Sequence, residues 1–126
     1  MLDALRMGVA ASRLLEEGVD PDLPAEYRGR PTSRIDWRSA FFLATAGGGD
    51  VLDLPVGRFV PGNAFDAVIV DAEIADGGIR IFEGVDSLED MLAKILYTAS
   101  ARNIAAVFVA GRAVHDASKS PRCGDN

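Results

Sequence analysis

The chain has 126 residues, of which 48% are apolar and 25% charged, so it can form one globular domain with a buried core. Its net charge of −6 argues against binding to a nucleic-acid backbone, and no apolar run approaches the ~20 residues that span a bilayer. One histidine and one cysteine cannot supply the roughly three nitrogen or sulfur ligands of a catalytic zinc or iron site, and a single cysteine favours the cytoplasm.

The chain begins with a predicted helix over 2–17. Apolar residues at helical spacing, among them Leu5 and Val9, cover most of its circumference, which suggests packing against more than one neighbour. Gly18 is a suitable C-terminal stop. Three prolines then mark 19–34 as a long loop, and such loops are commonly functional or laid over another surface.

A second helix is expected over 37–46. Asp36 is a good N-cap for it, because its carboxylate can accept a hydrogen bond from the first turn. The three glycines 47–49 are expected to break this helix. Residues 51–54 can form one further turn.

Two strands and a third helix are expected next. The β-branched run inside 65–71 predicts a short buried strand, and 79–82 predicts a weaker one. Ser87, followed three residues later by Asp90, resembles a capping box with aspartate in place of glutamate. It predicts a helix that continues to about Ala99.

The sequence then predicts a hairpin. Val107 and Val109 belong to one strand, Ala110 and Gly111 form the turn, and Val114 lies in the return strand. Residues 118–126 read as a flexible tail. Taken alone the chain is predicted to be α+β, with few strands for the apolar surface of its helices.

Four stretches of the chain carry a resemblance to a known family: MLDALRMGVAASRLL (1–15), DWRSAFFLATAGGGDVLDL (36–54), VGRFVPGNAFDAVIVD (56–71) and ILYTASARNIAAVFVAGRAV (95–114). Together these stretches resemble the amidohydrolase superfamily, most closely its guanine deaminases. They cover nearly the whole chain outside the loop and the tail. In the last of them, Leu96-Tyr97 and Arg102-Asn103-Ile104, ahead of Val-x-Val-x-Gly, point to guanine deaminases in particular.

This resemblance implies an α/β architecture. Residues 1–54 would be the C-terminal helices of a (β/α)₈ barrel, and 55–117 the C-terminal part of a small β-sandwich with an added helix. The rest of the barrel would precede residue 1, together with every metal ligand of the family. We therefore expect no catalytic, metal-binding or substrate-binding residue in this chain, and no activity from the chain alone.

The resemblance also implies the function of a parent protein: zinc-dependent conversion of guanine and water to xanthine and ammonia, in the cytoplasm. A zinc-bound water would attack the ring carbon that carries the amine. The chain's partners would be the missing N-terminal barrel portion and, in the complete enzyme, a second copy of it. The alternatives are another deaminase, of adenosine, cytosine or triazine type, or a non-catalytic module from a truncated or split gene.

Three features could carry chemistry but have simpler structural explanations. His115 could be a ligand or base, although its place at the end of the hairpin favours a surface side chain. The glycines 47–49 could cradle a phosphate, but they follow a helix and lack a Walker lysine. Cys123, in the tail, is most simply a free thiol.

Two pairs of polar residues also have simpler structural explanations. Asp66 and Asp71 could be paired carboxylates, but they lie five positions apart on one strand and so face opposite sides. Turn acids at the two strand ends are the favoured interpretation. Arg102 and Asn103 could touch substrate or a partner subunit, but a role in fixing the turn before the hairpin is favoured.

Overall fold

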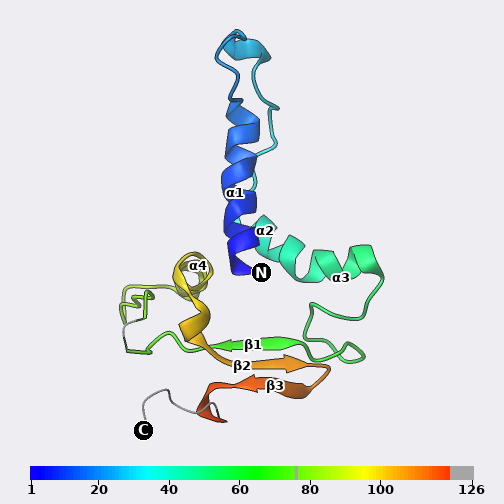
Figure 1. Ribbon diagram of the computed structural model, residues 1–126, viewed down its shortest axis with the longest axis vertical. Helices are drawn as coiled ribbons and strands as arrows, with labels where there is room; N and C mark the ends of the chain where they lie inside the picture. The colour runs from blue at the N-terminus through cyan, green and yellow to red at the C-terminus, as the bar shows by residue number, and fades with distance from the viewer. Residues whose placement is uncertain (76, 120–126) are drawn as a thin grey trace, which may run out of the picture.

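A computed structural model describes residues 1–75 and 77–119 of the chain (Figure 1). Within them it mixes helices with one antiparallel sheet, as expected for α+β, and shows no barrel. The helices lie to one side of the sheet. The elements are α1 (Leu2–Glu17), α2 (Trp37–Ala44), α3 (Ala46–Leu52), β1 (Ala67–Val70), α4 (Leu88–Thr98), β2 (Ile104–Val109) and β3 (Arg112–Asp116), with short 3₁₀ helices at Ala25–Tyr27, Ala101–Asn103 and Ala117–Lys119.

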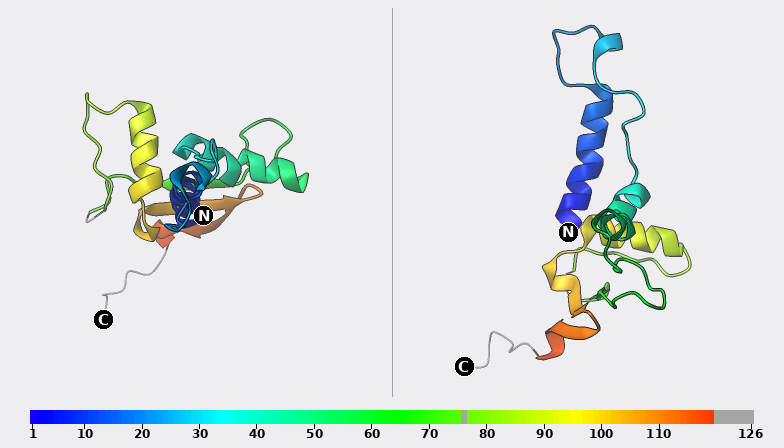
Figure 2. Two further views of the ribbon diagram at one scale, coloured as in Figure 1. Left: turned by 90° about the horizontal axis from the view of Figure 1, so that it is seen from above. Right: turned by 90° about the vertical axis from the view of Figure 1, so that its right-hand side faces the viewer.

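Helix α1 has the predicted bounds. Gly18 ends it with φ 73°, and its N–H donates to the carbonyl of Leu14 at 2.8 Å. Two apolar residues of the predicted face, Leu5 and Val9, are each only 4% exposed. The far half of the helix carries the 18–34 loop away from the sheet (Figures 1 and 2).

The predicted break at the glycines was wrong. Helix α2 ends at Ala44, and the chain turns at Thr45, whose hydroxyl donates to the carbonyl of Phe41 at 2.7 Å. The glycines lie inside α3, where a Cβ on Gly49 would stand 2.7 Å from the carbonyl oxygen of Val56. The lack of a side chain at Gly49 permits close packing of the following loop. A helix propensity assigned residue by residue does not register this packing.

The sheet has the order β1-β2-β3, with both pairs antiparallel. The predicted strand over 79–82 is absent: these residues form a loop. Ile79 is buried, and the N–H of Phe82 donates to a carboxylate oxygen of Asp86 at 2.7 Å. The local hydrogen bond to Asp86 gives this backbone a partner other than a neighbouring strand.

Helix α4 begins with the predicted capping box. Ser87 Oγ accepts from the N–H of Asp90 at 3.1 Å, and Asp90 Oδ2 accepts from the N–H of Ser87 at 3.0 Å. Asp86, just before the helix, pairs with Lys94 at 2.5 Å. That ammonium, together with the Phe82 N–H, lowers the pKa of the Asp86 carboxyl.

A small core joins the helices. It is formed by Leu5 and Val9 of α1, Ala40 of α2 and Leu96 of α4, with Leu92 and Trp37 packed against it. The core thus includes a side chain from each side of the predicted boundary at residues 54 and 55. The division into 1–54, 55–117 and 118–126 stays a prediction.

The hairpin turn contains a strained alanine. Ala110 adopts φ 48° and Gly111 φ 76°, the two left-handed residues of a type I′ turn. The N–H of Ala110 donates to Asp66 Oδ1 at 2.7 Å and that of Gly111 to the carbonyl of Phe65 at 2.8 Å. These bonds hold a conformation that costs a non-glycine residue roughly 1–2 kcal/mol.

Ala110→Gly is therefore expected to stabilise the chain by about 1 kcal/mol, because glycine relieves the left-handed strain. Ala113→Gly, within β3, is the matched control and should destabilise by about 0.5–1 kcal/mol. Urea unfolding at one low chain concentration measures both. A loss of stability in Ala110→Gly would show that the alanine is not strained.

Candidate functional site

The described residues enclose an apolar cavity of about 900 Å³, called here the hollow. It lies between the first turns of α1, the helix α4 and one face of the sheet. Apolar side chains make up most of its lining, among them Leu2, Phe41, Val68, Val70, Leu92 and Ile104. A surface of this kind is suited to apolar packing rather than to polar chemistry.

The ionic side chains of the hollow, Arg6 and Asp3, are engaged in structural contacts. Arg6 Nη1 pairs with Asp3 Oδ1 at 2.9 Å. Its Nε donates to the carbonyl of Leu96 at 2.8 Å, and its Nη2 donates to that of Ala99 at 2.6 Å. The guanidinium thus ties α1 to the end of α4.

Asp66 and Asp71 act as turn acids at the two strand ends, as the sequence predicts. Asp66 Oδ1 accepts from the N–H of Ala110, and Asp71 Oδ1 accepts from the N–H of Glu73 at 2.9 Å. They cap opposite ends of β1. The structure therefore gives no support to paired acid–base carboxylates.

Asn103 has the structural role that was favoured for it. It is fully buried, its Nδ2 donates to the carbonyl of Asp71 at 2.9 Å, and its Oδ1 accepts from the N–H of Ser100 at 3.0 Å. These bonds fasten the turn before β2 to the end of β1. Arg102 beside it is exposed.

The remaining candidates are not brought together. His115 is exposed on β3, opposite Val107. The N–H of Gly49 donates to the carbonyl of Thr45 at 3.2 Å and is not free to bind phosphate. Cys123 lies outside the described residues.

Residues 1–75 and 77–119 contain no group of three or more histidine, cysteine, aspartate or glutamate side chains placed to hold a metal ion. These residues do not fit a catalytic zinc centre. Helices long and apolar enough to cross a bilayer are likewise absent from this part of the chain.

Comparison with known proteins decides the family. Residues 1–114 match the model of the amidohydrolase family. The chain belongs to the amidohydrolase family. Human guanine deaminase is 33% identical over 119 residues, which are 90% of this chain and 24% of that protein.

Two further relatives agree. A probable guanine deaminase of Schizosaccharomyces pombe is 38% identical over 89 residues, 68% of this chain and 17% of the relative. The guanine deaminase of Dictyostelium discoideum is 32% identical over 82 residues, 64% of this chain and 18% of the relative. The chain therefore spans about a quarter or less of the length of these relatives.

The sequence did not reveal the hollow or the contacts of Arg6. The hollow is made by residues far apart in the chain, from Leu2 to Val107, and no local pattern brings them together. One signal was present: the broad apolar surface of α1, which leaves Met7 67% and Leu14 59% exposed in this structure. This surface predicts packing against more than one neighbour, and in the structure α1 packs against both α2 and α4 while part of its apolar surface stays exposed.

Proposed function

We propose that this chain is a structural part of an amidohydrolase that deaminates guanine. On this proposal it corresponds to the C-terminal helices of the barrel, 1–54, and the C-terminal strands of the small β-sandwich, 55–117. The observation that carries the proposal is the apolar hollow, which is open to solvent. The relatives of the chain, at 32–38% identity, are guanine deaminases.

The exposed apolar surface supports this role. Val68 and Ile69 of the sheet are about half exposed, and Leu88 at the start of α4 is 84% exposed. Leaving such side chains in water forgoes roughly 1.5–3 kcal/mol each. A surface with this much apolar area, open to solvent on several elements, is typical of one that is covered in the complete protein.

The proposed reaction is guanine plus water to xanthine plus ammonia. Zinc and its ligands would be supplied by another part of the polypeptide, since the described residues do not fit a metal site. The chain's own contribution is structural: its α1–α2–α4 core and its sheet form the surface against which the rest of the barrel packs. A misplacement of ~1 Å at a catalytic group can cost on the order of 100-fold in rate.

Restoring the missing part tests this proposal. The chain is joined downstream of, or co-expressed with, the complementary portion of a guanine deaminase. Xanthine should form from guanine, with adenine and cytosine turned over more slowly. The complementary portion alone should be inactive, because its barrel lacks the helices that brace it.

The alternatives predict different results. Preference for adenosine, cytosine or a triazine would identify another deaminase. A correctly folded, zinc-loaded complex could also turn over neither guanine nor any of these compounds. In that case the chain would be a non-catalytic module and the proposed function would be wrong.

A further inference from the structure

Helix α4 lacks a C-terminal cap of its own. It has no basic residue in its last turn, and its C-cap residue, Ala99, is extended rather than left-handed. The last carbonyls of a helix need donors from elsewhere. Arg6 of α1, 90 positions before Leu96 and 93 before Ala99, supplies two of them through Nε and Nη2.

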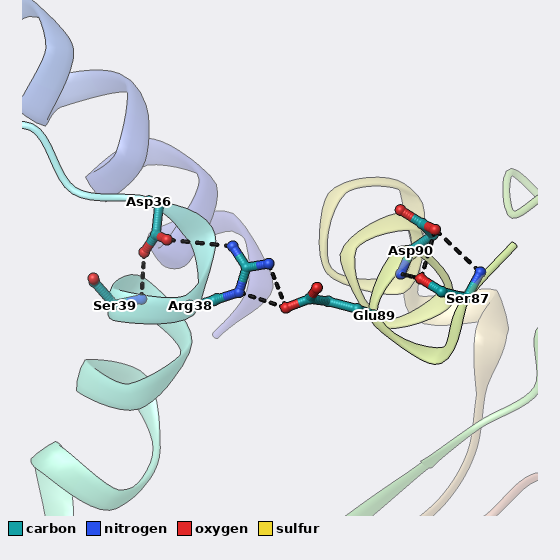
Figure 3. Close-up of polar contacts among 6 residues, drawn as sticks. All are labelled: Asp36, Arg38, Ser39, Ser87, Glu89 and Asp90. Carbon is teal, nitrogen blue, oxygen red and sulfur yellow. Dashed lines mark hydrogen bonds and ion pairs between the residues drawn. The ribbon is translucent and has the colours of Figure 1, made fainter.

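A second arginine holds the other end of α4. Arg38 of α2 pairs with Glu89 in the first turn of α4, with Nε donating at 2.6 Å, and also lies 3.5 Å from Asp36 (Figure 3). Arg38 and Glu89 are each more than half exposed, and such surface pairs contribute little. Arg6 is 26% exposed, so the C-terminal contact is the better shielded of the two.

The position of Arg6 ties the contact to the hollow. Leu2 and Arg6 belong to the wall of the hollow that α1 forms, and Leu96 and Ala99 belong to a second wall, at the end of α4. The two charge-assisted hydrogen bonds of Arg6 join these two walls. Because Ala99 leads directly into the Ser100–Asn103 turn that fastens β1 to β2, the same contact places α1 relative to the sheet.

We propose that Arg6 is a positioning residue that caps α4 from α1 and thereby sets the separation of the two walls of the hollow. Its consequence for enzyme assembly rests on the proposed function: the hollow receives the remaining part of the same enzyme, and Arg6 keeps the surface in the shape that this part fits. The capping itself does not depend on that function.

Hydrogen exchange of the 126-residue chain tests the capping. In Arg6→Met the amides of 96–99 should exchange about 10- to 100-fold faster, with the β2–β3 amides changed much less, because charged hydrogen bonds to the helix end are lost. Arg6→Lys should be intermediate, since an ammonium reaches fewer carbonyls. Asp3→Asn, which removes only the ion pair, should keep the protection.

Three results with Arg6→Met or Asp3→Asn would overturn the capping role. These are unchanged exchange in Arg6→Met, an equal acceleration at every amide, or the same local loss in Asp3→Asn. If Arg6→Met fails to fold, Arg6→Lys decides: acceleration confined to 96–99 supports the cap, and wild-type exchange rates at these amides refute it. Lack of protection at 96–99 in the unaltered chain also refutes it.

Complementation tests the consequence for assembly. With the complementary portion of the enzyme titrated against the chain, Arg6→Met should raise the concentration needed for half-maximal guanine turnover about tenfold or more, and Arg6→Lys should restore part of the affinity. An unchanged titration would overturn the role in assembly. If the unaltered chain gives no turnover with a folded partner, the proposed function fails, while the exchange experiment still decides the role of Arg6 as a cap.

Discussion

Leu5→Asp is expected to destabilise the α1–α2–α4 core by about 5 kcal/mol, because an unpaired carboxylate would replace a packed leucine. Leu5 is 4% exposed and contacts the cluster that contains Val9, Ala40 and Leu96. The loss is comparable to the whole stability of many small domains, about 5–15 kcal/mol. The loss of stability is measured as a loss of the helical circular-dichroism signal at low urea. Val9→Asp should destabilise the core to a similar extent.

Met7→Asp is the matched control in the isolated chain. It lies on the same helix, but its side chain is 67% exposed, so the helix signal should be retained. In the restored enzyme Leu5→Asp should lower guanine turnover, whereas His115→Ala should leave it nearly unchanged. If His115→Ala abolished turnover in a folded, zinc-loaded protein, the structural role proposed for the chain would be wrong.

The isolated chain is expected to fold at low concentration and to associate as its concentration rises. Its apolar side chains remain open to solvent in the hollow and along the sheet, and each buried one would contribute roughly 1.5–3 kcal/mol. Sedimentation velocity should show species larger than the monomer, and a fluorescent dye that binds apolar surface should bind. The restored enzyme should bind less dye.

A pair of valines locates the surface responsible. Val68 lines the hollow and is 48% exposed, while Val109 lies outside it and is 49% exposed. Val68→Glu should reduce association and dye binding more than Val109→Glu, because only the first places a charge in the hollow. A compact monomer with sharp thermal unfolding and no dye binding would contradict the expectation.

Local signals predicted much of this fold. The bounds of α1 follow from apolar spacing and Gly18, and the start of α4 follows from Ser87 and Asp90. The hairpin follows from alternating valines on either side of a short turn. Each of these features depends on residues a few positions apart, which a sequence displays directly.

Features that depend on distant residues were missed. The 79–82 segment has strand-like residues but bonds to Asp86 instead of to a neighbouring strand. The glycines 47–49 predict a helix break, whereas in the structure they lie inside α3 and Gly49 packs against Val56, which follows seven positions later. Arg6 bonds to Leu96 and Ala99 at the end of α4, which lie 90 and 93 positions away, and no sequence pattern within α1 predicts this contact.

Metal analysis of the purified 126-residue chain, combined with a guanine assay, tests the central claim most directly. After dialysis against zinc-containing and then zinc-free buffer, the chain is predicted to retain far less than one zinc per molecule and to form no xanthine. The physical reason is that the described residues lack a ligand set. Close to one zinc per chain, together with measurable xanthine formation, would contradict the account and place an active site in this chain.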